Sequence, residues 1–206
     1  MLDLLLTNPA AFTLIFGGII IAIGIHEFSH CYVADRLGDP TPRALGRLTL
    51  NPLAHLDPLG TLTILITGLF GWGKPAPFDP YNLKNPKKDT ALIALAGPAS
   101  NVILAFLLAL ILRLATVPTS VSMILLGLIS LNINLALFNL LPIPPLDGSK
   151  VLSTFLSHEH GTRLQSFAGQ NSLLLVLFFI LPIFAGRSLA SMLISPLSTF
   201  LLNLLL

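Results

Sequence analysis

Residues 12–30 read FTLIFGGIIIAIGIHEFSH, an apolar run that ends in two histidines and a glutamate. No side chain before His26 in this run carries a charge, and ionisable groups inside apolar membrane segments usually serve a function. If the run is a helix, His26 and His30 stand one turn apart on one face, with Glu27 beside them. That spacing allows the two imidazoles to hold one zinc ion. The rest of the chain can be tested against this candidate site.

The composition indicates an integral membrane protein. Of the 206 residues, 54% are hydrophobic and only 10% are charged, against roughly 25% charged in soluble domains. The net charge of +2 and the lack of a basic stripe with interleaved aromatics give no indication of a nucleic-acid partner. The single cysteine, Cys31, excludes an internal disulfide and a cysteine-rich zinc site. No lysine or arginine precedes Arg36, so the first apolar run is expected to be a mature membrane helix rather than a signal peptide.

The apolar runs predict an all-α polytopic membrane protein made of a single domain, residues 1–206. Roughly 20 apolar residues are needed to cross the hydrocarbon core as a helix, and three runs meet that length. We expect membrane helices at 10–35, 90–114 and 121–141, a short helix at 149–156, and further C-terminal apolar helices at 172–183 and 189–206.

Basic residues give the expected orientation. Arg36, Arg43 and Arg47 directly follow the first span, which places the end that carries the histidines toward the cytoplasm. The site is therefore expected toward the cytoplasmic side of the membrane, and we expect this membrane to be a bacterial-type plasma membrane.

The apolar run from Leu59 to Phe70 is too short to span the membrane as a helix, and basic residues flank it on both sides. A re-entrant element fits both facts. The alternation in Thr61-Leu62-Thr63-Ile64 permits extended structure, so we expect this element to be strand-like.

Asp147 is the expected third ligand. Of the nine acidic residues, only Glu27 and Asp147 lie away from polar loops, and both are expected at the same membrane face. Two histidines and one carboxylate form a catalytic zinc site with an open fourth position, one zinc per chain. Glu27 is the expected catalytic base. The alternative for Asp147 is that it caps the short helix that follows it.

Other polar groups approach the same face. Asn101 and Asn139 can position substrate or stabilise an oxyanion, although each can equally be an interhelical hydrogen bond. His158-Glu159-His160 is a second run of ligand types, but it lies in a polar stretch far from the other candidates.

Two motifs together resemble the site-2 protease family of intramembrane zinc metalloproteases. They are His26-Glu27-Phe28-Ser29-His30 and the pattern Asn-x-x-Pro-x-x-x-x-Asp-Gly over residues 139–148. The resemblance covers roughly residues 15–155, the family's catalytic core. It implies His26, His30 and Asp147 as zinc ligands and Glu27 as the base.

Further segments share the resemblance. Residues 51–60, which include His55, and residues 71–75 look like the family's segment between the first two core helices, often a strand-like element that meets substrate. His55 can therefore orient substrate, although a role in a loop turn is as reasonable. Gly97-Pro98-x-x-Asn101 is similar to another family motif. The family implies a transmembrane client protein as substrate, but this chain shows neither a PDZ domain nor a nucleotide-sensing module.

Two other classes of function stay open. Some zinc transporters also carry this histidine pattern on a membrane helix, but a carrier needs polar groups in both membrane halves. An inactive scaffold that only binds client helices would have no use for Glu27. The expected partners are a transmembrane client and the lipid bilayer, and the oligomeric state is not indicated.

Overall fold

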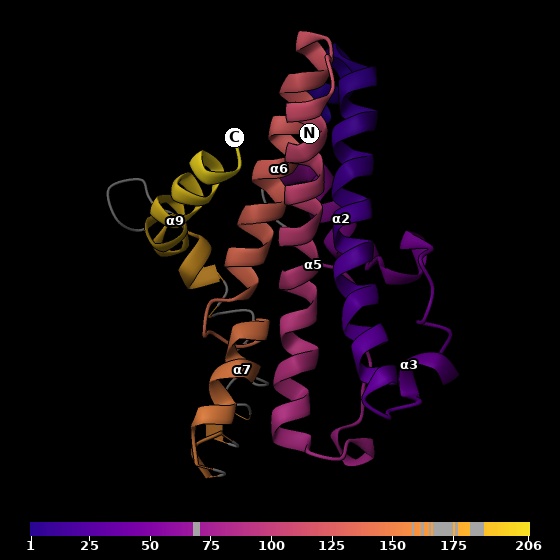
Figure 1. Ribbon diagram of the computed structural model, residues 1–206, viewed down its shortest axis with the longest axis vertical. Helices are drawn as coiled ribbons and strands as arrows, with labels where there is room; N and C mark the ends of the chain where they lie inside the picture. The colour runs from indigo at the N-terminus through magenta and orange to yellow at the C-terminus, as the bar shows by residue number, and fades with distance from the viewer. Residues whose placement is uncertain are drawn as a thin grey trace.

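The computed structural model describes residues 1–67, 71–157, 159–161, 163–164, 166, 175, 177–181 and 188–206. Three long helices, α2, α5 and α6, stand side by side and form the body of the molecule (Figure 1). α7 continues below α6 against α5, and α9 packs on α6. The elements are α1 (Leu2–Thr7), α2 (Pro9–Arg36), α3 (Thr41–Ala44), η1 (Pro52–His55), α4 (Pro58–Thr67), η2 (Pro80–Asn82), α5 (Pro86–Leu114), α6 (Thr119–Asn139), α7 (Asp147–Phe155) and α9 (Leu189–Leu205).

The three predicted membrane spans are present. α2, α5 and α6 are each long and apolar enough to cross a membrane, so the expectation of an all-α polytopic membrane protein is confirmed. α5 begins four residues earlier than expected, at Pro86, because proline is favoured in the first turn, where its missing N–H costs nothing. Half of the expected helix at 172–183 lies outside the described residues, and of the described ones residues 175 and 177–180 are helical.

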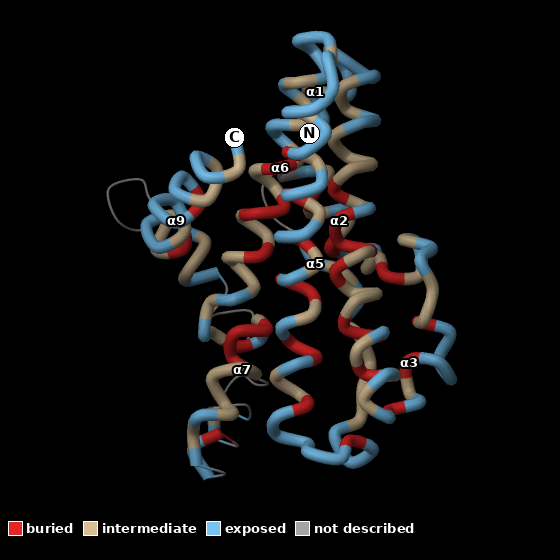
Figure 2. The backbone as a smooth tube through the Cα atoms, viewed as in Figure 1, coloured by how far each residue is buried: buried red, intermediate tan, exposed pale blue. Residues whose placement is uncertain are grey.

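The helices pack through small side chains. Ala105 and Ala109 of α5 are buried against Ile129 and Ile133 of α6. Small residues let helix backbones approach closely, which is how helices associate within a membrane. Buried positions follow the facing sides of α2, α5 and α6 and continue into the start of α7 (Figure 2).

The expectation of a strand-like element at 59–70 is wrong for its described part, because residues 58–67 form helix α4. Asp57 explains the difference: its Oδ1 accepts the N–H of Gly60 at 2.8 Å, and Pro58 occupies the first helical position. These helix-start signals outweigh the alternation of threonines and apolar residues. The described residues of this region keep one isolated antiparallel bridge, between Leu56 and Gly73.

Asp39 joins two loops at the end of the bundle that carries the basic residues. Its buried carboxylate accepts hydrogen bonds from the backbone N–H and hydroxyl of Thr41, from the backbone N–H of Asp79 and from Nδ2 of Asn82, at 2.6–3.1 Å. Burial opposes ionisation of Asp39, but these hydrogen bonds outweigh it and lower the pKa of the carboxyl from its ordinary value. The Asp39 carboxylate is therefore ionised in the folded protein, and it holds the two loops together.

Candidate metal centre

Three possible ligand atoms converge where α2 meets the start of α7. Nε2 of His26 lies 3.1 Å from Nε2 of His30, and Oδ2 of Asp147 lies 3.3 Å and 3.1 Å from these two nitrogens. All three residues are buried. Within the described part of the chain this is the one group of three or more such residues that can hold a metal ion.

The local sequence explains how Asp147 reaches the histidines. Residues 141–146, with three prolines, leave regular helix between α6 and α7. α7 begins at Asp147 itself, so Leu146 occupies the N-cap position and the Asp147 carboxylate faces the histidines. The capping alternative for Asp147 is therefore wrong. Gly148 permits the tight return, since a Cβ there would overlap the backbone oxygen of Leu140.

Hydrogen bonds on the far side of each imidazole fix which ring nitrogen is free. Nδ1 of His30 lies 2.6 Å from the backbone oxygen of Ile93, which can only accept, so this nitrogen carries the hydrogen. Nδ1 of His26 lies 2.6 Å from Oδ1 of Asn101. Nδ2 of Asn101 is turned the other way, toward Asn132, so its oxygen faces His26. Both histidines therefore present bare Nε2 lone pairs to the centre.

The arrangement fits a zinc ion. Two nitrogen lone pairs and a carboxylate oxygen about 3 Å apart repel each other unless a cation lies among them. Around a tetrahedral zinc with bonds of about 2.0–2.1 Å, neighbouring ligand atoms lie about 3.3 Å apart, close to the observed 3.1–3.3 Å. Imidazole and carboxylate are also the ligand types expected of a catalytic zinc site.

Gly97 of α5 gives the two imidazoles their space. A Cβ at this position would overlap Nε2 of His30 and lie 2.6 Å from Nε2 of His26. The Gly97-Pro98-x-x-Asn101 segment thus serves the centre twice, through the room left at Gly97 and through the hydrogen bond of Asn101.

Glu27 lies between the two histidines in the sequence, and its side chain is half-buried. The segment around Gly73 crosses beside it, so that a Cβ on Gly73 would lie 3.2 Å from Cγ of Glu27. A side chain at position 73 would therefore crowd Glu27.

Lys150 was not among the predicted site residues. Its Nζ lies 3.1 Å from Oδ1 of Asp147, the carboxylate oxygen that points away from the shortest histidine contacts. The only sequence signal is its spacing of three residues from Asp147 on one helix.

The structure does not bring His55 and Asn139 into this cluster. His55 is fully buried; its Nε2 donates to the backbone oxygen of Thr49, and its Nδ1 accepts from Arg47 at 3.4 Å. Nδ2 of Asn139 donates to Leu135 in its own helix at 2.9 Å. Their suggested roles in positioning substrate stay predictions, and His158 lies outside the described residues.

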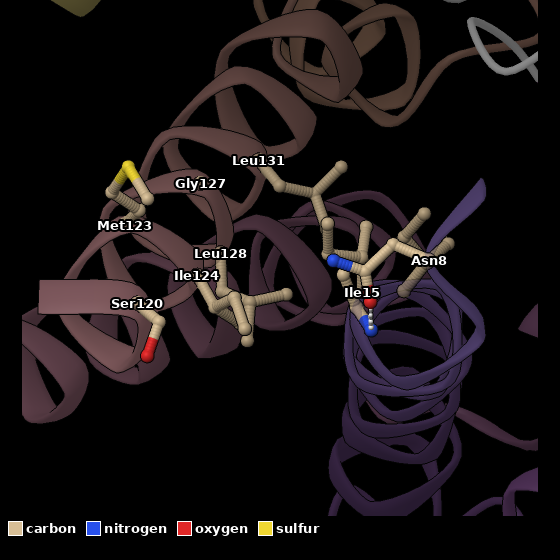
Figure 3. A pocket seen from close by; sticks show the side chains of 10 residues that line it. Asn8, Ile15, Ser120, Met123, Ile124, Gly127, Leu128 and Leu131 are labelled. Carbon is tan, nitrogen blue, oxygen red and sulfur yellow. Dashed lines mark hydrogen bonds between the residues drawn. The ribbon is translucent and has the colours of Figure 1, made fainter. Parts of the chain in front are cut away.

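A groove of about 340 Å³ lies between α2 and α6, toward the opposite end of the bundle from the histidines. Figure 3 shows Asn8 and Ile15 on one side of it, facing Ser120 and other side chains of α6. None of its lining residues is a histidine, cysteine or carboxylate. The lining residues are Asn8, Ala11, Ile15, Ile19, Ser120, Met123, Ile124, Gly127, Leu128 and Leu131.

Comparison with known proteins identifies the family. Residues 113–183 match the model of peptidase family M50, and no solved structure matches. The chain is 37% identical to "Putative zinc metalloprotease YwhC" of Bacillus subtilis, over 80% of this chain and 79% of that protein. It is 32% identical to "Putative zinc metalloprotease Rip2" of Mycolicibacterium smegmatis, over 86% of this chain and 70% of that protein. The Mycobacterium tuberculosis Rip2 is 30% identical, over 88% and 72%. Together with the histidine and aspartate cluster, these matches mean that the chain belongs to peptidase family M50, the site-2 protease family of zinc metalloproteases.

Proposed function

We propose that this integral membrane metalloprotease hydrolyses peptide bonds in or near transmembrane segments of client membrane proteins. The observation that carries the proposal is the buried cluster of two imidazoles and one carboxylate, with a glutamate next to it in sequence, inside a bundle of membrane-spanning helices. His26, His30 and Asp147 hold the zinc in this proposal, and Glu27 is the catalytic base.

The chemistry divides among these residues. Zinc, when bound, acts as a Lewis acid and lowers the pKa of water toward neutrality. Glu27 accepts the proton of the attacking water as its oxygen bonds to the scissile carbonyl carbon. The carbon–nitrogen bond then breaks, and Glu27 returns the proton to the leaving amine. The Lys150 ammonium pairs with Oδ1 of Asp147 and offsets part of its negative charge, which reduces the free-energy cost of keeping the carboxylate buried.

The distribution of basic residues supports a cytoplasmic location for the site. Lys84 is exposed in the loop that leads into α5, and Lys87 and Lys88 are exposed in the first turn of that helix. They lie at the end of the bundle shared by Arg36 and Arg43. By the positive-inside rule this end faces the cytoplasm. Water then has the shorter route to the centre from that side.

The same distribution favours a hydrolase over a metal carrier. A carrier needs polar groups along a path through both membrane halves. The groove between α2 and α6, in the other half of the bundle, is lined without a single metal-ligand side chain.

Replacement of the base tests the proposal. Glu27→Gln is expected to bind one zinc per chain yet cleave about 10²–10⁴-fold more slowly, assayed with a panel of tagged single-span membrane proteins in detergent. Glu159→Gln is the matched control, because Glu159 is exposed and pairs with Arg163 away from the centre. Cleavage by Glu27→Gln at the wild-type rate would contradict the proposed mechanism. Zinc flux into proteoliposomes that depends on His26 and His30 would instead identify a transporter.

A further inference from the structure

Asn132 of α6 is buried, and its side chain forms hydrogen bonds with Asn101 and Leu128 rather than with a ligand atom of the centre. A buried asparagine in a membrane helix is often only an interhelical hydrogen bond. The hydrogen bonds of this side chain, however, belong to a chain in which each donor and acceptor is determined. This chain of hydrogen bonds ends at His26, a proposed zinc ligand.

The first hydrogen bond of the chain is to a backbone carbonyl. Nδ2 of Asn132 donates to the backbone oxygen of Leu128 at 2.8 Å. A carbonyl can only accept, so the amide nitrogen of Asn132 is held toward it and Oδ1 is turned toward α5. That oxygen accepts Nδ2 of Asn101 at 3.0 Å. The amide of Asn101 is thereby also fixed, with its oxygen toward His26.

The last step acts on the imidazole. Oδ1 of Asn101 lies 2.6 Å from Nδ1 of His26 and can only accept, so the ring hydrogen stays on Nδ1. Nε2 is then bare, as a metal ligand must be. If the Asn101 amide turned over, its NH₂ group would face Nδ1. The ring hydrogen would then move to Nε2 and occupy the lone pair that points toward His30 and Asp147.

We propose that Asn132 is a positioning residue for the metal centre: through Asn101, it selects the tautomer of His26 that can bind zinc. The inference rests on the proposed assignment of His26 as a ligand. The Asn101 amide has one other acceptor, the backbone oxygen of Ala22 at the longer distance of 3.4 Å. Asn132 therefore provides most of the orientation, and its loss weakens the selection without abolishing it.

Zinc affinity, measured by competition with a chelator, gives the first test. Removing a partner of a ligand typically weakens metal binding about 10–100-fold. Asn132→Leu is expected to weaken zinc binding about 10-fold, and Asn101→Ala is expected to weaken it more within that range. Asn132→Asp, buried in its protonated form, can donate its O–H to Leu128 and still offer an oxygen to Asn101, so it is expected to bind zinc close to the wild-type level. Asn134→Leu is the matched control, since Asn134 lies on the same helix and its amide donates to Ser130 one turn away.

A double variant separates positioning from general support of the bundle. Because Asn132 acts through Asn101, Asn132→Leu should weaken zinc binding no further in a chain that already carries Asn101→Ala. Additive losses would overturn the proposal. If Asn132→Leu does not fold, Asn132→Ser takes its place, because the serine hydroxyl is too short to reach Asn101.

The tautomer itself can be observed in the metal-free protein. With ¹⁵N-labelled histidine, the nitrogen that carries hydrogen and the bare nitrogen give separate signals, and the His26 signals are identified by comparison with His26→Gln. We expect hydrogen on Nδ1 in the wild type and a mixture of tautomers in Asn132→Leu. If a folded Asn132→Leu variant shows an unchanged spectrum and unchanged zinc affinity, the role of Asn132 is overturned, while the proposed function is not affected. Failure of the wild type to bind zinc would instead reject the proposed function.

Discussion

No side chain fits on Gly97 beside the ring of His30: a methyl group there would overlap Nε2, the nitrogen turned toward Asp147. The described cluster holds no residue of α5, yet this helix limits the space available to the two imidazoles. The histidines can adopt their positions only because α5 has no side chain at this point.

Gly97→Ala is expected to weaken zinc binding while leaving the helices in place. Overpacking of a filled site costs about 1–3 kcal/mol, equivalent to a roughly 5–150-fold loss of affinity when it falls on the bound state. Zinc content and affinity of the purified protein check this result. Gly127→Ala is the control, because nothing lies within 4 Å of a Cβ at that glycine; equal behaviour of the two variants would contradict the role of Gly97.

Asp147→Asn is expected to lose zinc. Asparagine keeps the shape of the side chain but removes the negative charge, and two neutral imidazoles alone bind zinc weakly. Metal analysis after purification should find about one zinc per chain in the wild type and much less in the variant. Asp79→Asn should retain its zinc, since Asp79 precedes the short helix η2 and its carboxylate accepts the N–H of Tyr81 rather than contacting the histidines. A full zinc content in Asp147→Asn would rule out this ligand.

Lys150→Met is expected to slow cleavage about 10-fold or more, in line with the loss of other partners of metal ligands. Without the ammonium, Oδ1 of Asp147 is left buried without its cationic partner. Lys150→Arg keeps a cation near the carboxylate and should restore most of the activity. Steady-state cleavage rates at saturating zinc separate the two variants, and equal rates for both would show that the charge is not required.

Asp39 predicts how stability depends on pH. The pKa of this carboxyl is lowered in the folded state, so its stabilising effect is fully present above the unfolded pKa of about 3.9 and is lost as the pH falls through the folded value. Asp39→Asn is expected to destabilise the protein by about 1–3 kcal/mol at neutral pH. Thermal unfolding in detergent should show the gap between variant and wild type closing in acid. A gap that is independent of pH would contradict this account.

Cysteine labelling tests the orientation. In a Cys31→Ala background, Lys84→Cys should react with an impermeant reagent only from the cytoplasmic side, because Lys84 is exposed among the basic residues. Thr116→Cys, in the exposed turn between α5 and α6, should react only from outside. The reverse pattern would place the metal centre at the outer face.

The membrane spans could be predicted because length and hydropathy alone decide whether a helix can cross a bilayer. The two histidines could be predicted to share a face because four residues make one helical turn. The proximity of Asp147 to the histidines could be predicted because an acid in an apolar stretch needs a partner, and the histidines were the candidates at the same membrane face.

Contacts that depend on how helices are rotated against each other could not be predicted. Asn101 was recognised as polar, but its partner, His26 or substrate, depends on the packing of α5 on α2. Asn132 was one of several asparagines in one helix, and only its rotation separates it from Asn134. Lys150 reads in the sequence as an ordinary solvated lysine. The strand-like element was mispredicted because alternation over four residues was given more weight than the helix start at Asp57-Pro58.

The three candidate ligands come from two distant parts of the chain, α2 and the start of α7, so an ion held among them would close a long loop through the bundle. By thermodynamic linkage, whatever binds only the folded state also stabilises it, by RT ln(1 + [L]/Kd). A chelator should therefore lower the unfolding temperature as well as stop cleavage. Under zinc scarcity, the cell would have less folded protein as well as less active enzyme.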